Sequence, residues 1–259
     1  MTINELSTNL YKLYGTVTRA RGCFLYTKKG IRLTDLFQEN GRAILGWDAG
    51  NAFTHLKNVL SRGQTGSFIC EDNNRVAKAV SSLLVSDRQI FYFSNKMDAV
   101  KAAVQISPDN TSTYRPWSFD NQKWSEINCV IIEPPLPWTN TVYILAVLIN
   151  DSKSTPENSI NLPFALETAI ARSLYNLIEA LQNREEKDWF IYDTILTQYF
   201  ERKGPYLLSK VPASKYNDFV NHCLNLGIII NPDPKGLSII PYGADKGVFT
   251  KLKNSPFNY

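Results

Sequence analysis

The sequence predicts an α/β protein with a reduced, mostly parallel sheet that has helices on both faces, followed by a smaller α+β carboxy-terminal domain. The first observation is that short apolar runs alternate with helical patterns across residues 51–160. The second is the uninterrupted apolar run at residues 127–132, which is typical of a strand covered on both faces. The third is that the order changes beyond residue 161, where helices are followed by a strand pair.

Composition is that of an ordinary globular protein. The chain has 259 residues, of which 44% are hydrophobic and 20% are charged, and this length can bury one large or two small cores. It contains no apolar run of about 18 residues, and its first residues lack the basic and apolar regions of a signal peptide. We therefore expect neither a membrane span nor a secretion signal.

Charge and cysteine content narrow the function classes. The net charge is +4, and the lysines and arginines are spread along the chain, so we expect no specific nucleic-acid partner. The four cysteines lie far apart and lack the spacing of a metal site. Three of them lie in apolar segments, which indicates buried, reduced thiols and a cytoplasmic location.

The amino-terminal segment, residues 1–50, begins with a helical pattern and continues as an extended hairpin. Apolar residues at helical spacing mark residues 3–14. Residues 22–33 then have the pattern of two strands joined by a turn at Gly30, which can take positive φ there. We expect this segment to pack on the carboxy-terminal domain.

The middle of the chain, residues 51–160, is the predicted large domain. Residues 110–126 within it are polar and aromatic, and include Trp117 and Trp124. A polar loop at residues 150–161 closes the domain. Helices are expected at residues 51–63, 72–85 and 97–106, and strands at residues 66–70, 89–93, 127–132 and 142–149.

The remainder, residues 161–259, is the predicted small domain. It should contain a long helix after Pro163, a second helix over residues 188–202, and a third helix from Ser214 to Gly227. Two short strands, at residues 228–230 and 237–240, and a short final helix complete it.

In its order of elements the chain resembles the fold type I pyridoxal-phosphate-dependent aminotransferases, especially those of class III. Residues 19–50 resemble the family's amino-terminal entry, with a basic residue and glycine, a hydrophobic strand pair and an apolar segment with glycines. The pair Glu133-Pro134 resembles the Glu-Pro that follows a central strand, and the strand ending at Pro241 resembles one of the small domain. The chain is identified as a degenerate, shortened member. The resemblance implies a homodimer, because the family's active site lies between two subunits.

The resemblance also indicates where a cofactor would bind. In class III enzymes a strand followed by Asn-Ser-Gly-Thr-Glu-Ala forms the phosphate cup, and small residues let the helix amino terminus approach the phosphate. The matching segment here runs from Tyr92 to Val100, with Lys96 at the glycine position. By this resemblance Asn95, Lys96 and Glu133 are the candidates for cofactor binding.

The family's other catalytic groups are not identifiable in the sequence. No strand ending in Asp-Glu precedes a Schiff-base lysine, and the lysine found in that interval, Lys153, lies in a polar loop. A solvated lysine lacks the lowered pKa that a Schiff base requires. Ser238 stands where many members have the arginine that binds the substrate carboxylate. Lys153 is therefore the candidate catalytic residue only if the chain is a working enzyme.

We predict a non-catalytic protein on an aminotransferase-like scaffold, which binds a ligand or partner and takes no cofactor. The alternative is a pyridoxal-phosphate-dependent aminotransferase with rearranged active-site residues, in which Lys153 or Lys96 forms the Schiff base. A third interpretation is an interaction module for a protein partner. It rests on Trp117, Trp124 and Trp138, because tryptophan is enriched at interfaces.

Overall fold

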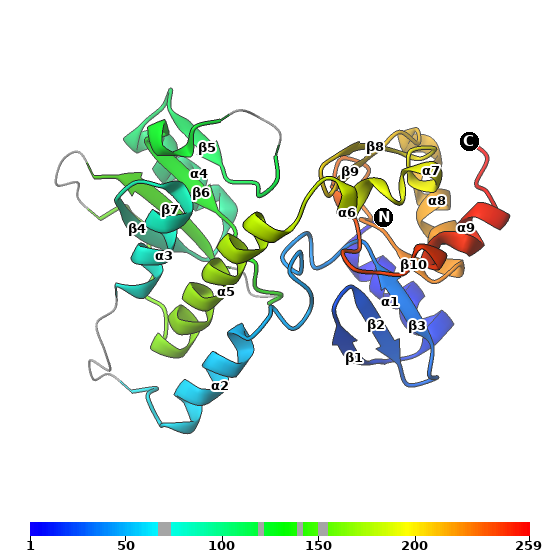
Figure 1. The fold of residues 1–259 in the computed structure, drawn as a ribbon, viewed down its shortest axis with the longest axis horizontal. Coiled ribbons are helices and arrows are strands. Elements are labelled where there is room, and N and C mark those ends of the chain that lie inside the picture. Colours follow the sequence, from blue (N-terminus) through cyan, green and yellow to red (C-terminus); the bar gives the residue numbers. More distant parts are fainter. Residues whose placement is uncertain (67–73, 119–121, 139–141, 150–154) are drawn as a thin grey trace. The chain divides into compact units, whose positions relative to one another are not determined.

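The computed structural model describes residues 1–66, 74–118, 122–138, 142–149 and 155–259. Internal contacts divide the chain into two compact units, and most of their helices and strands are labelled in Figure 1. The first unit consists of Met1–Asp48 and Asn183–Tyr259, and the second of Ala49–Gln182. The three-segment domain organisation with boundaries at residues 50 and 160 stays a prediction. No helix in the described ranges is long and apolar enough to cross a membrane.

The second unit is built on a four-stranded mixed sheet with the strand order β4-β7-β6-β5. Strand β7 is antiparallel to both of its neighbours, and only β5 pairs in parallel, with β6. The predicted mostly parallel sheet is therefore wrong. The strands are β4 (Arg88–Phe93), β5 (Thr111–Thr113), β6 (Cys129–Ile132) and β7 (Tyr143–Leu148).

The physical reason lies in the length of the connection between β6 and β7. Residues 133–142 are too few for the helical crossover that joins parallel neighbours, which needs about a dozen residues or more. The apolar run in β6 reports burial on both faces, since all four of its residues are buried, but burial does not determine strand direction.

Helix α4 (Lys96–Ile106) packs on this sheet through its alanines. Ala99, Ala102 and Ala103 lie against alternate residues of three strands, which share one face of the sheet. Small side chains bring the helix axis close to the sheet and fix the position of its amino terminus. The neighbouring residues are Phe91, Phe93, Cys129, Ile131, Leu145 and Val147.

The remaining helices of this unit follow the sequence patterns. Helix α2 (Ala52–Ser61), helix α3 (Arg75–Leu84) and the long α5 (Phe164–Asn183) lie where helices were predicted. A single 3₁₀ turn, η1 (Trp124–Glu126), precedes β6. The strand predicted at residues 66–70 lies almost wholly outside the described residues.

The first unit contains two sheets. One has the order β1-β2-β3-β10, in which β10 is parallel to β3 and the other pairs are antiparallel. The other has the order β11-β9-β8 and is antiparallel. The strands are β1 (Val17–Arg21), β2 (Phe24–Thr27), β3 (Arg32–Asp35), β8 (Phe200–Lys203), β9 (Tyr206–Ser209), β10 (Ile228–Ile229) and β11 (Ser238–Ile239). The helices are α1 (Ile3–Tyr14), α6 (Lys187–Phe190), α7 (Asp193–Leu196), α8 (Ala213–Asn225), η2 (Lys246–Phe249) and α9 (Thr250–Asn254).

The amino-terminal hairpin forms as the sequence predicts. Thr2 and Glu5 close a capping box at the start of α1. Gly30 has φ 75° in the turn between β2 and β3. Because β10 pairs with β3, the carboxy-terminal part of the chain completes the sheet that the hairpin begins.

The helix predicted over residues 188–202 is wrong. Two single-turn helices, α6 and α7, are followed by strand β8, which pairs with β9. The Gly204-Pro205 pair, which was expected to stop a helix, instead forms the loop of the β8–β9 hairpin, with Gly204 at φ 56°. Hairpin closure makes the preceding residues extended, and this long-range pairing overrides their helical pattern.

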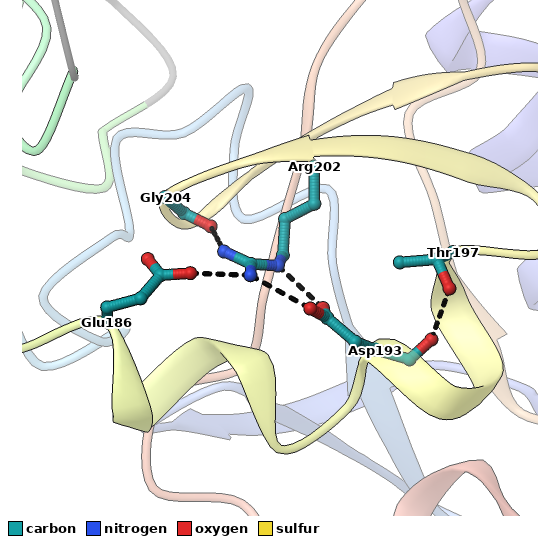
Figure 2. Close-up of polar contacts among 5 residues, drawn as sticks. All are labelled: Glu186, Asp193, Thr197, Arg202 and Gly204. Atoms are coloured by element: carbon teal, nitrogen blue, oxygen red, sulfur yellow. Dashed lines mark hydrogen bonds and ion pairs between the residues drawn. The ribbon is translucent and has the colours of Figure 1, made fainter.

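An ion-pair cluster around Arg202 joins the two short helices to this hairpin (Figure 2). Its guanidinium donates to both carboxylate oxygens of Asp193 at 2.6 and 2.9 Å, and lies 2.5 Å from a carboxylate oxygen of Glu186. A further N–H donates to the carbonyl of Gly204 at 3.1 Å. Hydrogen bonding to Asp193 raises the pKa of Arg202, so the pair is stable as ions.

The buried carboxylate of Asp35 organises the turn after β3. It accepts hydrogen bonds from the amides of Phe37 and Gln38, each at 2.9 Å, and from Trp47 Nε1 at 2.8 Å. Three successive non-glycine residues in this turn, Gln38, Glu39 and Asn40, have φ of 47°, 51° and 58°. Left-handed backbone of this kind is costly outside glycine, and the Asp35 side chain stabilises it.

Stability should depend on pH through Asp35. Burial raises its pKa to about 6, while its hydrogen bonds oppose the rise. The unfolded carboxyl titrates near pH 4, so between about pH 4 and 6 the folded state holds a proton that the unfolded state has released. This contribution, on the order of 3 kcal/mol, is present at low pH and is lost as pH rises through 6.

The check is urea unfolding measured from pH 4 to 7. Asp35→Asn removes the titrating group, so the free energy of unfolding of this variant should fall less steeply with pH than that of the wild type. Asp218→Asn, at an exposed position in α8, is the matched control and should keep the wild-type slope. Equal slopes in the wild type and Asp35→Asn would contradict the assignment.

Candidate functional site

The candidate site lies at one edge of the second unit's sheet, where β4 and β6 end. Both strands are antiparallel to β7, so they run in the same direction and their carboxyl ends meet at the same edge. Ser94 and Asn95 lead from β4 into α4, and Glu133 follows β6 directly. The sequence candidates Asn95, Lys96 and Glu133 therefore come together here.

Lys96 and Glu133 form an ion pair across this edge. The distance from Lys96 Nζ to Glu133 Oε1 is 2.8 Å, and the two side chains are 47% and 22% exposed. A pair this accessible to water adds at most about 1 kcal/mol to stability. The main consequence of the ion pair is that the positive charge of Lys96 is held against the carboxylate of Glu133.

The amino terminus of α4 is capped by its own side chains. Asn95 is the N-cap residue, and its Oδ1 accepts from the amide of Asp98 at 2.9 Å. Its Nδ2 donates to Asp98 Oδ2 at 2.7 Å. The Asp98 carboxylate lies in the first turn, where negative charge is favourable beside the positive end of the helix dipole. Asp98 and Glu133 together outweigh the single positive charge of Lys96.

A third carboxylate near this edge was not singled out in the sequence. Glu167 lies in the first turn of α5, and burial raises its pKa. Burial, followed by the charge of Glu167, also raises the pKa of Tyr92, which is the penultimate residue of β4. The available signal was a glutamate on the apolar stripe of a long helix. Its proximity to Tyr92 depends on tertiary packing that periodicity does not show.

The three candidate tryptophans have different surroundings. Trp124 packs against Tyr114 with ring centroids 4.9 Å apart, and its carbonyl accepts from the Arg88 guanidinium at 2.8 Å. Trp138 is 39% exposed and stacks on Phe53 of α2 at 6.3 Å. Trp117 has φ 56°, a left-handed conformation that is strained for a bulky residue.

One candidate residue of the enzyme interpretation and the position of the family's carboxylate-binding arginine remain to be described. Lys153 lies outside the described residues. Ser238, which stands at the position of the family's carboxylate-binding arginine, is buried in β11, and its hydroxyl accepts from the amide of Asn231 at 2.9 Å. The hydroxyl of Ser238 therefore has a structural partner in the first unit.

Comparison with known proteins tests the fold. No family model matches the chain. An acetylornithine aminotransferase from Elizabethkingia anophelis superposes with a TM-score of 0.66 over 98% of both chains, at 11% identity. The chain has an aminotransferase fold. An omega-transaminase from Sphaerobacter thermophilus gives a TM-score of 0.64 at 10% identity, over 93% of this chain and 91% of that one. The resemblance stated from the sequence is thereby confirmed at the level of the fold.

Two proteins are related to this aminotransferase-fold chain in sequence over nearly their whole length. An uncharacterised protein from Treponema pallidum is 22% identical over 284 residues, which is 90% of this chain and 91% of the relative. Another from Borreliella burgdorferi is 23% identical over 252 residues, which is 93% of this chain and 90% of the relative. Neither relative has an established activity, so the function is argued from the site.

Loss of the Asn95 cap at the start of α4 should lower the stability of the protein measurably. Asn95→Ala removes the acceptor for the Asp98 amide, and we expect it to lower the free energy of unfolding by about 1 kcal/mol. Asn95→Ser keeps a capping oxygen and should lose less than half as much. Urea unfolding followed by circular dichroism makes the comparison. Equal losses in the two variants would show that the cap is not what Asn95 contributes.

Proposed function

We propose that this chain is a non-catalytic protein on an aminotransferase-like scaffold, and that it acts by binding a ligand or partner. The observation that carries the proposal is the chemistry of the β4–α4 junction. Asn95 and Asp98 cap the helix, and Glu133 pairs with Lys96, so the junction's own side chains use the groups that a bound anion would need.

A pyridoxal phosphate does not fit these residues. Its phosphate would require free N–H groups at a helix amino terminus and surrounding positive charge. The Asp98 amide already donates to Asn95, and the carboxylates of Asp98 and Glu133 would repel a phosphate close by. Lys96 could contribute positive charge only by leaving Glu133. We therefore propose that the chain takes no cofactor.

The alternative is an aminotransferase with rearranged active-site residues. The extent of the structural likeness, 98% of this chain with acetylornithine aminotransferase, supports it. In this case Lys96 would have to release Glu133, or Lys153 would have to reach the sheet edge. The net negative charge of the described junction favours the non-catalytic proposal.

We also propose an oligomeric state and a cellular location for the protein. We propose a homodimer, in keeping with the scaffold, with a protein partner as a further binding role. Trp138 is the best-placed of the three tryptophans for such contact, because 39% of it is exposed beside Phe53. Three described cysteines, Cys23, Cys129 and Cys223, are buried and not joined in disulfides, which supports a reducing, cytoplasmic location.

Absorbance spectroscopy with added pyridoxal phosphate tests the proposal. We expect the wild-type protein to show no Schiff-base band after gel filtration, because neither the phosphate nor the lysine has a suitable site. Lys96→Ala should give the same spectrum. A retained band that borohydride abolishes, with the reduced adduct mapped to Lys96 or Lys153, would overturn the proposal and establish the alternative.

A further inference from the structure

Although lysines and arginines are spread along the chain, the excess of basic over acidic residues lies in its amino-terminal segment. Residues 6–34 contain six of the 28 lysines and arginines and none of the 24 aspartates and glutamates. The rest of the chain therefore has 22 basic and 24 acidic residues, and is slightly acidic. The net charge of +4 is a property of this one segment.

Strand register brings three of these basic residues to one face of the β1–β2–β3 sheet. Arg19, Tyr26 and Arg32 lie opposite one another in one row across the three strands. Arg21 and Phe24 lie opposite each other in the next row. Side chains two residues apart along a strand lie on the same face of the sheet, so both rows share one face. We call these five residues the arginine–aromatic face. The neighbouring residue Leu33 points to the opposite, buried side.

Two of the three arginines of this face lie over its aromatic rings. Arg19 Cζ lies 5.6 Å from the Tyr26 ring centroid, and Arg32 Cζ lies 4.5 Å from that of Phe24. The three arginines are exposed, whereas the two rings are half-buried. A stacked guanidinium keeps the N–H groups at its edge available for an anion.

No carboxylate neutralises these arginines in the part of the chain that the structure describes. The salt bridges found there involve Lys96, Lys123, Lys187 and Arg202, and none involves Arg19, Arg21 or Arg32. The Lys29 ammonium donates to the Leu13 carbonyl at the end of α1. The face thus presents three cations without internal counterions on a sheet with two aromatic rings.

We propose that the arginine–aromatic face binds single-stranded nucleic acid. Guanidinium edges match phosphate oxygens, and the guanidinium planes that lie over the two rings can in turn stack with exposed bases, which single strands of DNA and RNA share. Phe24 and Tyr26 are two residues apart on β2, so their rings are spaced about 7 Å along the strand. The role is independent of the proposal that the junction at α4 is non-catalytic.

An anionic membrane surface fits this face less well. Stable attachment to lipid combines basic charge with protruding apolar side chains. On this face the apolar side chains are Phe24 and Tyr26, which are half-buried beneath guanidinium groups. The pairing of planar cations with rings favours a ligand that has both phosphates and planar bases.

Fluorescence anisotropy with a labelled oligouridylate of about 12 nucleotides tests the proposal. Arg19→Glu/Arg32→Glu should weaken binding at least about tenfold and reduce the salt dependence, because each phosphate contact contributes a slope of about −0.7. Lys251→Glu/Lys253→Glu, at exposed positions on α9, is the charge-matched control and should bind like the wild type. If the arginine pair and the lysine pair weakened binding equally, the loss would be due to net charge alone, and the proposal would be overturned.

A second pair of variants separates the shape of the guanidinium groups from their charge. It also keeps the proposal testable if the Arg→Glu pair does not fold. Arg19→Lys/Arg32→Lys keeps both charges but loses the planar, stacked groups, and should still weaken binding severalfold. Oligothymidylate should bind comparably, and phosphatidylserine vesicles should bind poorly. Wild-type affinity in the Arg→Lys pair, no binding of the oligonucleotides by the wild type, or preferential vesicle binding would each overturn the proposal.

Discussion

The three hydrogen bonds to the buried Asp35 carboxylate are the constraint on which the first unit depends. Two of them stabilise the left-handed turn that follows β3, and the third binds the indole of Trp47 to the same carboxylate. That turn receives the carboxy-terminal part of the chain. The amides of Leu36 and Phe37 donate to the carbonyl of Ile229, and the amide of Ile239 donates to the carbonyl of Leu36. Without the Asp35 acceptor, the turn that joins the beginning and the end of the chain would lose its support.

In the second unit, different residues of helix α4 pack on the sheet and form the first turn at the candidate site. Helix α4 still follows β4 at the sheet edge, because its alanines pack on the sheet whatever residues occupy its first turn. The first turn itself is governed by different side chains, Asn95, Lys96 and Asp98, which satisfy one another and Glu133. The residues that pack α4 on the sheet are thus distinct from those of its first turn, so the packing does not depend on what the first turn binds.

Local signals predicted most elements, and long-range pairing explains the failures. The hairpin around Gly30 and helix α4 follow from turn chemistry and helical periodicity, which are legible in sequence. Lys96 and Glu133 were named only through the family resemblance, and their ion pair depends on tertiary packing. The helix predicted over residues 188–202 failed because pairing between β8 and β9 outweighs local periodicity. The mostly parallel sheet failed because burial says nothing of direction, although the ten residues between β6 and β7 already favoured an antiparallel pair. The arginine–aromatic face was missed because its arginines are separated along the chain and meet only through register.

Phosphorus NMR of pyridoxal phosphate tests whether the β4–α4 junction provides a phosphate site. The measurement observes the phosphate itself and does not depend on a Schiff base being formed. We expect the phosphorus resonance to keep its free position and width when equimolar protein is added, in the wild type and in Lys96→Ala alike. A shifted or strongly broadened resonance in the wild type that returns to the free position in Lys96→Ala would show that the junction binds the phosphate.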